Sequence, residues 1–303
     1  MHVAVSGSGG LIGRAAVAAL RAGGDDVTLL QRRSSPSPSG LRTVVWPDAA
    51  HDPDAARRLA GVDAVLHLAG SPIAAGRWTA AVKREIRLSR VDATKALIEV
   101  LGAAGARPRA FVCASAVGYY GDRGDEELDE RSAPGDDFLA QVCRAWEEAA
   151  QGAEGLGARV VRLRTGVVLA REGGMLARLL PFFRAGLGGP VGSGRQWLPW
   201  IDLEDEVGAI LALLRDADAQ GPFNLAAPEP VRSRSFAQAL GRTLGRPAFL
   251  TLPGAAVRAV FGEMGAAVLL GGQRALPQRL LATGYRFRRS AIEDALRHAL
   301  GQG

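Results

Sequence analysis

Cysteine and histidine are scarce in this sequence, with two cysteines and four histidines among 303 residues. Cys113 and Cys143 are too few for a disulfide framework, and their spacing is not that of metal ligands. The histidines also lack metal-site spacing, so we expect no bound metal. No run of 18 or more apolar residues is present, and no signal peptide precedes the first apolar segment at Val3. We therefore expect a soluble, cytoplasmic protein without a membrane partner.

A basic stripe is also missing, although the formal net charge is +6 and the isoelectric point is about 10.1. The arginines are scattered between acidic residues, so we expect no nucleic-acid partner. A few of these arginines could instead bind the phosphate of a small molecule. Apolar residues make up 48% and charged residues 22% of the chain, which is a globular balance without the signature of disorder.

Short β-branched runs alternate with longer helical patterns in the first half of the chain. The predicted strands are Val3–Val5, Asp26–Leu30, Thr43–Trp46, Ala64–Leu68, Ala110–Ala114 and Arg159–Leu163. The predicted helices between them are Leu11–Ala22, Thr79–Leu101 and Asp137–Gln151. This alternation is typical of βαβ units and predicts an α/β fold, a Rossmann-type doubly wound parallel sheet.

The composition changes after Arg164, where glycine-rich loops surround a short apolar helix at Met175–Phe183. A helix at Asp202–Leu214 and a strand at Pro222–Leu225 return to the earlier pattern, and the chain from Ser233 onward is mainly helical. We predict a dinucleotide-binding domain at 1–165, completed by about 202–226. Residues 166–201 and 227–303 would form a smaller, mainly helical C-terminal cap that binds the substrate.

A glycine turn at the N-terminus carries the main functional signal. Gly7, Gly10 and Gly13 follow the first strand as G-x-x-G-x-x-G and lead into the first helix. Small residues let the backbone turn sharply and approach a pyrophosphate, while the helix N-terminus offers amide donors. The predicted cofactor-binding turn is Gly7, Ser8, Gly9, Gly10, Leu11, Ile12 and Gly13.

Two arginines follow the second strand, where an NAD site usually has an acidic residue for the ribose 2′-hydroxyl. Arg32 and Arg33 suit a 2′-phosphate by charge and by their forked geometry. The sequence therefore favours NADP over NAD, with a pair of solvated loop arginines as the alternative.

Two further motifs resemble those of the short-chain dehydrogenase/reductase superfamily, of the extended, sugar-nucleotide-epimerase-like kind. They are His67-Leu68-Ala69-Gly70, at a strand end, and Ala114-Ser115-Ala116-Val117-Gly118-Tyr119-Tyr120-Gly121. More narrowly, the chain resembles an atypical, uncharacterised NAD-dependent epimerase/dehydratase-like family. The stretches that carry this resemblance are 76–79, 115–125, 135–139, 164–169, 194–197 and 272–274. The resemblance implies that Leu68, Ala69 and Gly70 support the adenine side of the cofactor.

The superfamily's proton machinery is missing. Its working set is a serine, an asparagine and a Tyr-x-x-x-Lys pair, in which the lysine lowers the pKa of the tyrosine and holds the ribose. Alignment on Glu147 puts Leu139 at the tyrosine position and Cys143 at the lysine position. Arg90 falls where the asparagine would be, and Ser115 is the candidate serine.

Other residues are candidates for the missing roles. Tyr119 or Tyr120 would be the general acid, although one could pack under the sheet and the other lie on the surface. Arg164 would hold the cofactor or a substrate anion. Arg195 and Trp197 would bind the substrate, with a place in the cap core as the alternative for Trp197.

We predict structural roles for three other polar residues, His67, Asp202 and Asp205, the last two at the start of a helix. The functional prediction is an NADP-dependent oxidoreductase or nucleotide-sugar-epimerase-like enzyme that acts on a small molecule. The alternative is a non-catalytic NADP-binding sensor or scaffold.

Overall fold

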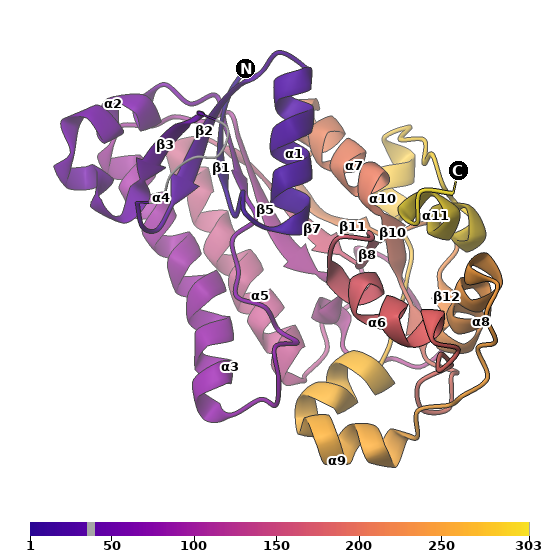
Figure 1. Cartoon of the computed structure of the whole chain (residues 1–303). Coiled ribbons are helices and arrows are strands. Elements are labelled where there is room, and N and C mark those ends of the chain that lie inside the picture. Colours follow the sequence, from indigo (N-terminus) through magenta and orange to yellow (C-terminus); the bar gives the residue numbers. More distant parts are fainter. Residues whose placement is uncertain (35–39, 303) are drawn as a thin grey trace.

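A computed structural model describes residues 1–34 and 40–302 of the chain. Its centre is a seven-stranded parallel sheet in the order β11-β7-β5-β4-β1-β2-β3 (Figure 1). The strands are β1 (His2–Ser6), β2 (Asp26–Gln31), β3 (Arg42–Val45), β4 (Ala64–His67), β5 (Ala110–Ala116), β7 (Arg159–Thr165) and β11 (Gly221–Leu225). The order reverses between β1 and β4, and such switch points are where doubly wound sheets bind ligands.

Helices cover both faces of the sheet because alternate strand residues point to opposite sides. Val3 and Val5 pack with α1 (Leu11–Ala22) and α7 (Leu203–Arg215). Ala4 belongs to the opposite core, with α2 (Pro53–Ala60), α4 (Ala93–Ala103) and α5 (Phe138–Gln151). This is the doubly wound α/β fold that the alternating pattern predicts.

The cap has a core of its own, in which Trp200 is fully buried. Three helices surround it, α6 (Gly174–Arg184), α8 (Ser233–Leu244) and α11 (Ile292–Ala299). Other helices are α9 (Gly254–Gly265) and α10 (Gln278–Ala282). Shorter turns are the π-helical η5 (Ala266–Leu270) and the 3₁₀ turns η1 (Trp46–His51), η3 (Val117–Tyr120) and η4 (Gly152–Leu156). Three two-stranded sheets pair β8 (Val167–Leu169) with β10 (Trp200–Asp202), β9 (Trp197–Leu198) with β12 (Val231–Arg232), and β6 (Glu127–Leu128) with β13 (Arg274–Ala275).

Two local features differ from the sequence-based predictions. Helix α2 was not predicted, because its eight residues include two arginines, an aspartate and only one large apolar side chain. The single helix expected at Thr79–Leu101 consists of α3 (Ala80–Arg87), a π-helical turn η2 (Leu88–Asp92) and α4. The insertion of a π turn changes the helical period locally and so places Arg90 differently from a regular helix.

The proposed division into domain and cap stays a prediction. Strand β11, near the end of the segment 202–226, pairs with β7 in the central sheet, and α7 packs on the same sheet. Within the described part of the chain, no helix has both the length and the apolar character needed to cross a membrane.

Candidate functional site

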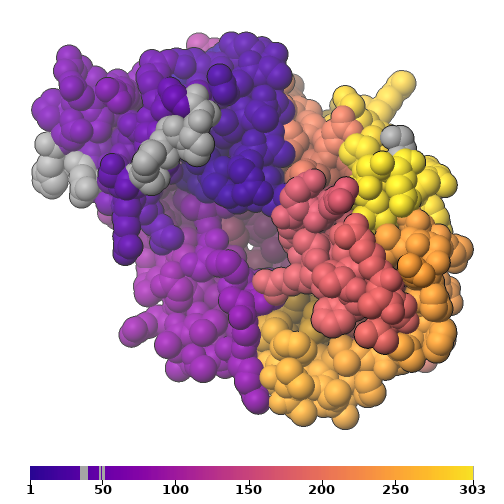
Figure 2. All heavy atoms as spheres, viewed as in Figure 1, coloured from indigo at the N-terminus to yellow at the C-terminus, as the bar shows by residue number. Residues whose placement is uncertain are grey.

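A cavity of about 510 Å³ lies at the carboxyl ends of the central strands, between the sheet and the cap. Its walls come from the glycine turn, the ends of β4, β5 and β7, one face of α5, and the cap segments 197–199 and 271–273. Figure 2 shows the recess between the indigo-to-purple N-terminal half and the red-to-orange cap. The site therefore lies where the reversal of strand order predicts a ligand.

The glycine turn forms one end of the cavity and tolerates no side chain at its two outer glycines. Gly7 has a φ of +72°, and a Cβ there would lie 2.6 Å from the carbonyl carbon of Leu68. A Cβ at Gly13 would lie 2.2 Å from the carbonyl oxygen of Gly7. Gly10 donates its amide to Gly7 over 2.9 Å and precedes α1, whose first turn contains no acidic residue. The close packing leaves the first amides of α1 available to an anion in the cavity.

Most of the turn residues predicted from the sequence contact the cavity. The residues that line it are Gly7, Gly10, Leu11, Ile12 and Gly13, together with Leu68 at the end of β4. Ser8, Gly9, Ala69 and Gly70 are adjacent in the chain but are not among the lining residues. Arg32 and Arg33 follow β2 at the same edge of the sheet and are exposed.

The α5 face predicted to replace the Tyr-x-x-x-Lys pair does line the cavity. Leu139 and Cys143 both contact it, whereas Glu147 lies one turn deeper and is 5% exposed. Burial raises the pKa of the Cys143 thiol to about 12, so this cysteine is a neutral, unreactive thiol near pH 7. The face therefore offers the cavity an apolar side chain and a thiol where the superfamily has a phenol and an ammonium.

Ser115 connects the cavity to a buried polar network. Its hydroxyl donates to Glu147 Oε1 over 2.9 Å, and Glu147 forms a bidentate ion pair with Arg164 at 2.8 and 2.9 Å. Arg164 is 3% exposed and does not line the cavity. Burial alone would lower the pKa of Arg164, but its hydrogen bonds and ion pair with Glu147 raise it above the ordinary value. The guanidinium is thus held by protein groups, away from the predicted cofactor contact.

Both tyrosines pack around Arg164 instead of lining the cavity. Tyr120 is fully buried, donates its hydroxyl to Asn224 Oδ1 over 2.7 Å and accepts from Arg164 over 3.0 Å. Burial raises the pKa of Tyr120 to about 12. The Tyr119 ring stacks on the Arg164 guanidinium at 3.5 Å. Their positions give no support to the prediction that either is the general acid.

The two predicted substrate residues of the cap are in different positions. Trp197 lines the cavity and donates its indole N–H to Asp125 over 2.8 Å. The guanidinium groups of Arg232 and Arg274 lie 4.4 and 4.9 Å from its ring centroid. Arg195 is exposed and is not a lining residue. Trp197 is therefore fixed at the cap wall, and Arg195 remains a prediction.

Two ionisable groups near the cavity were given no role in the site prediction. Arg90 lines the cavity from η2 and is half-buried. Glu206, on α7, is fully buried and accepts from the hydroxyl of Thr165, a lining residue, over 2.9 Å. Its second oxygen has no hydrogen-bond partner, and burial raises the pKa of Glu206 to about 8. The alignment marked Arg90 only as the residue at the asparagine position and gave it no role, and Glu206 does not stand out, because a glutamate in a charged helical stretch is typical of an exposed face.

His67 has the structural role that was predicted for it. Its imidazole is 1% exposed and lies between Ser6, at 2.6 Å, and Thr94, at 3.0 Å. Thr94 Oγ1 donates to the Arg90 carbonyl and accepts from the indole of Trp146, so His67 Nε2 donates to it and Nδ1 accepts from Ser6. Burial lowers the pKa of His67 to about 4. The neutral ring joins β1, β4 and α4 behind the cavity.

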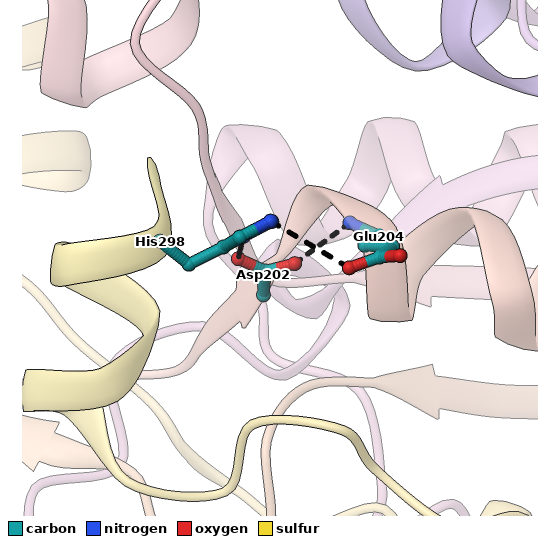
Figure 3. Close-up of side chains that lie close together, drawn as sticks. All are labelled: Asp202, Glu204 and His298. Atoms are coloured by element: carbon teal, nitrogen blue, oxygen red, sulfur yellow. Dashed lines mark hydrogen bonds and ion pairs between the residues drawn. The ribbon is translucent and has the colours of Figure 1, made fainter. Parts of the chain in front are cut away.

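One group of potential metal ligands lies outside the cavity. Asp202, Glu204 and His298 bring their side chains together where α11 meets α7 (Figure 3). His298 Nδ1 lies 2.9 Å from Asp202, and Arg289 is 2.7 Å from Glu204 and 3.3 Å from Asp202. Arg288 adds an ion pair to Glu204 at 2.6 Å. The arginines already neutralise these carboxylates, and the group ties α11 of the cap to the start of α7, which packs on the central sheet.

Comparisons with known proteins agree with this architecture. Residues 3–226 match the model of the NAD dependent epimerase/dehydratase family, and residues 252–299 match a domain of unknown function, DUF1731. The chain is 45% identical over 299 residues to the epimerase family protein MT2273 of Mycobacterium tuberculosis, covering 98% of this chain and 97% of that protein.

Two solved structures are similar over nearly the whole chain. The crystal structure of human epimerase family protein SDR39U1 (isoform 2) with NADPH matches with a TM-score of 0.91 and 38% identity, covering 99% of both chains. A nucleoside-diphosphate sugar epimerase from Corynebacterium glutamicum matches with a TM-score of 0.79 and 38% identity, covering 99% of this chain and 58% of that one.

Proposed function

The chain belongs to the NAD dependent epimerase/dehydratase family, and on that premise we propose that it binds NADP(H) and acts on a small molecule as an atypical dehydrogenase/reductase. The observation that carries the proposal is the Gly7–Gly13 turn, packed against Leu68 at one end of a 510 Å³ cavity that extends to the cap. The space in front of Gly7 and Gly13 and the free amides of α1 fit a diphosphate. The presence of NADPH in the similar human protein supports this proposal.

The preference for NADP over NAD rests on Arg32 and Arg33. Both are exposed just beyond β2, at the edge of the sheet where β1 leads into the glycine turn. A 2′-phosphate attached to the adenosine ribose would lie near this strand end in a Rossmann fold. Two guanidinium groups supply the charge and the paired N–H donors that such a phosphate needs.

When bound, the nicotinamide ring supplies hydride transfer, and the chain supplies orientation and charge. The Ser115 hydroxyl donates its hydrogen bond to Glu147, so its oxygen lone pairs remain free to accept a hydrogen bond from a substrate hydroxyl. Glu147 is held by Arg164, which fixes the direction of the Ser115 hydroxyl. We assign Ser115 the role of orienting the substrate where β5 ends at the cavity.

A second candidate function, a non-catalytic NADP(H) sensor, is favoured by one observation. None of the described residues that line the cavity is a tyrosine, lysine, histidine, aspartate or glutamate. With Leu139 and Cys143 on the α5 wall, the cavity lacks an ordinary group for proton transfer near pH 7. The enzyme proposal therefore needs a reaction whose proton comes from the substrate or from solvent.

Fluorescence titration with NADPH and NADH tests cofactor binding and its selectivity. We expect NADPH to bind roughly 10- to 100-fold more tightly than NADH, as one or two charge-assisted phosphate contacts predict. The R32Q/R33Q variant should lose this preference while NADH affinity stays the same. R144Q, on the exposed face of α5, is the control for net charge. Absence of NADPH binding at millimolar concentration would refute the proposal.

Turnover separates the enzyme from the sensor. NADPH oxidation is measured against a panel of carbonyl compounds, with S115A, Y119F and Y120F as variants. Loss of turnover in S115A at unchanged NADPH affinity would support the enzyme and the role of Ser115. Tight NADPH binding without oxidation by any compound would support the sensor. The phenol variants should retain turnover, because neither ring lines the cavity.

A further inference from the structure

Arg90 is a cation in the cavity wall without an anionic partner among the described residues. It lies in η2, a π-helical turn, and such turns are frequent at functional sites. Among the residues that the structure describes, no carboxylate forms an ion pair with it. The two arginines beside Trp197 differ in this respect, since Arg232 pairs with Asp125 and Arg274 pairs with Glu127.

The surroundings of Arg90 hold its guanidinium in place. The group lies over the indole ring of Trp146 with its centre 5.2 Å from the ring centroid. A Cβ at Gly70 would lie 3.2 Å from Arg90 Cζ, so the glycine at the end of the β4 motif leaves room for the guanidinium. Nη1 donates to the carbonyl of Ile86 at 3.3 Å and lies 3.5 Å from the hydroxyl of Ser89. Among the described residues Nε and Nη2 have no hydrogen-bond acceptor. Neither atom is among the fully buried atoms that lack a partner, so both remain accessible from the cavity.

Partial burial of a guanidinium without a counter-charge is costly, because the group loses part of its water and no anion replaces that water. Burial lowers the pKa of Arg90, but a guanidinium keeps its charge near pH 7. Its planar fork of N–H groups matches the two oxygens of a carboxylate or phosphate better than it matches single hydroxyls. The free donors, the charge and the cavity together fit an oxyanion.

We propose that Arg90 is an oxyanion-binding residue of the cavity, which holds a phosphate or carboxylate group of the ligand. Its charge lies near Cys143, the residue at the position of the superfamily's lysine. Arg90 thus brings a cation to this region from the η2 side, while α5 brings none. The anion has two possible sources, the diphosphate of NADP(H) or an anionic group of the substrate, and the first source rests on the proposed function.

Two binding measurements distinguish the sources. The first is NADPH affinity by fluorescence titration, for the native chain and for R90Q and R90K. The second is calorimetric binding of inorganic phosphate or malonate, with and without saturating NADPH. R87Q removes the same charge from an exposed position of α3, one turn earlier, and is the matched control. The measurement without cofactor stays informative even if NADPH does not bind.

A roughly 10- to 100-fold loss of NADPH affinity in R90Q, with R87Q unchanged, would support Arg90 as a contact of the cofactor diphosphate. Binding of phosphate or malonate that R90Q abolishes and R87Q retains, at unchanged NADPH affinity, would support a substrate anion. R90K should keep part of either affinity, since it keeps the charge and loses the fork.

Thermal unfolding of the ligand-free variants excludes a merely structural role. Because Arg90 is unpaired, R90Q should unfold at the same temperature as the native chain or higher. If R90Q is folded and both NADPH affinity and anion binding match those of R87Q, the proposal is overturned. It is equally overturned if R90Q unfolds at a lower temperature, R90K restores that temperature, and neither variant changes binding.

Discussion

Glu206 gives the protein a pH-dependent stability whose size follows from the structure. The carboxyl group is fully buried, its single hydrogen bond comes from Thr165, and Oε2 has no partner. Burial therefore raises its pKa from the ordinary 4.5 to about 8 in the folded chain. Between these two pKa values the folded state keeps the proton while the unfolded state releases it, so the unfolding free energy falls as the pH rises.

The magnitude follows from the difference in proton binding. Within the window, each pH unit lowers the unfolding free energy by about 1.4 kcal/mol, and the loss ends once the pH exceeds the folded-state pKa. Between pH 5 and pH 8 the contribution of this group falls by about 3–4 kcal/mol. The glutamine in E206Q resembles the protonated acid in shape and does not titrate. Any cost of its unpaired amide is the same at every pH, so the slope and not the offset is the test.

Urea unfolding followed by circular dichroism at pH 5, 6, 7, 8 and 9 measures this slope. We expect the unfolding free energy of E206Q minus that of the native chain to rise by about 3–4 kcal/mol from pH 5 to pH 8. E148Q changes an exposed glutamate on α5 and should follow the native curve. A difference between E206Q and the native chain that stays constant across this range would refute the assignment of a buried, protonated carboxyl group.

Four other substitutions have expected outcomes. G13A should lower NADPH affinity more than tenfold or destabilise the chain by about 1–3 kcal/mol, because its Cβ would overlap the Gly7 carbonyl. G9A, whose Cβ would lie in open space, is the control in the same titration. E147Q should lower the unfolding free energy by about 3–5 kcal/mol by leaving buried Arg164 without its partner, and a loss below about 1 kcal/mol would contradict that ion pair. Burial lowers the pKa of His67 to about 4, so the unfolding free energy of the native chain should fall as the pH falls from about 6.5 to about 4. In H67N this fall should be smaller, and an unchanged fall, measured by urea unfolding over the same pH range, would contradict the prediction. D202A removes the N-cap of α7 and the contacts to His298 and Arg289. It should therefore lower the unfolding free energy by about 1–2 kcal/mol without affecting NADPH binding. A binding defect equal to that of G13A would contradict the structural role of Asp202.

The glycine turn and the strand order could be predicted because both depend on local signals. Gly7, Gly10 and Gly13 are required by backbone approach over a few residues, and the structure places all three in the cavity wall. The buried parallel strands are short β-branched runs, as at Val3–Val5, which local composition reveals. The observed bounds differ from the predicted ones by at most two residues for each strand of the central sheet.

The side chains of the site depend on packing between distant segments, and here the sequence was less informative. Arg164 was predicted to hold an anion, but its partner Glu147 belongs to a helix whose pairing with β7 is a tertiary contact. Tyr120 follows a strand that ends at the cavity, yet the 3₁₀ turn η3 directs its ring toward Asn224. The π turn that positions Arg90 has no pattern distinct from that of the helices on either side.

Two polar groups, one in the cavity wall and one behind it, lack a partner among the residues that the structure describes. Arg90 lacks an anion, and Glu206 behind Thr165 carries an oxygen without a hydrogen-bond partner. Each lowers the stability of the ligand-free chain, whereas filling the space with apolar side chains would raise it. The Ser115–Glu147–Arg164 network shows that this fold can bury a charge against an opposite charge, since Glu147 forms a bidentate ion pair with Arg164. Arg90, which lines the cavity without a carboxylate partner among the described residues, differs from this network, and the difference is what the proposed oxyanion role of Arg90 predicts. The α5 wall thus lacks the phenol and the ammonium of the Tyr-x-x-x-Lys pair, while the glycine turn and the cavity beside it are in place.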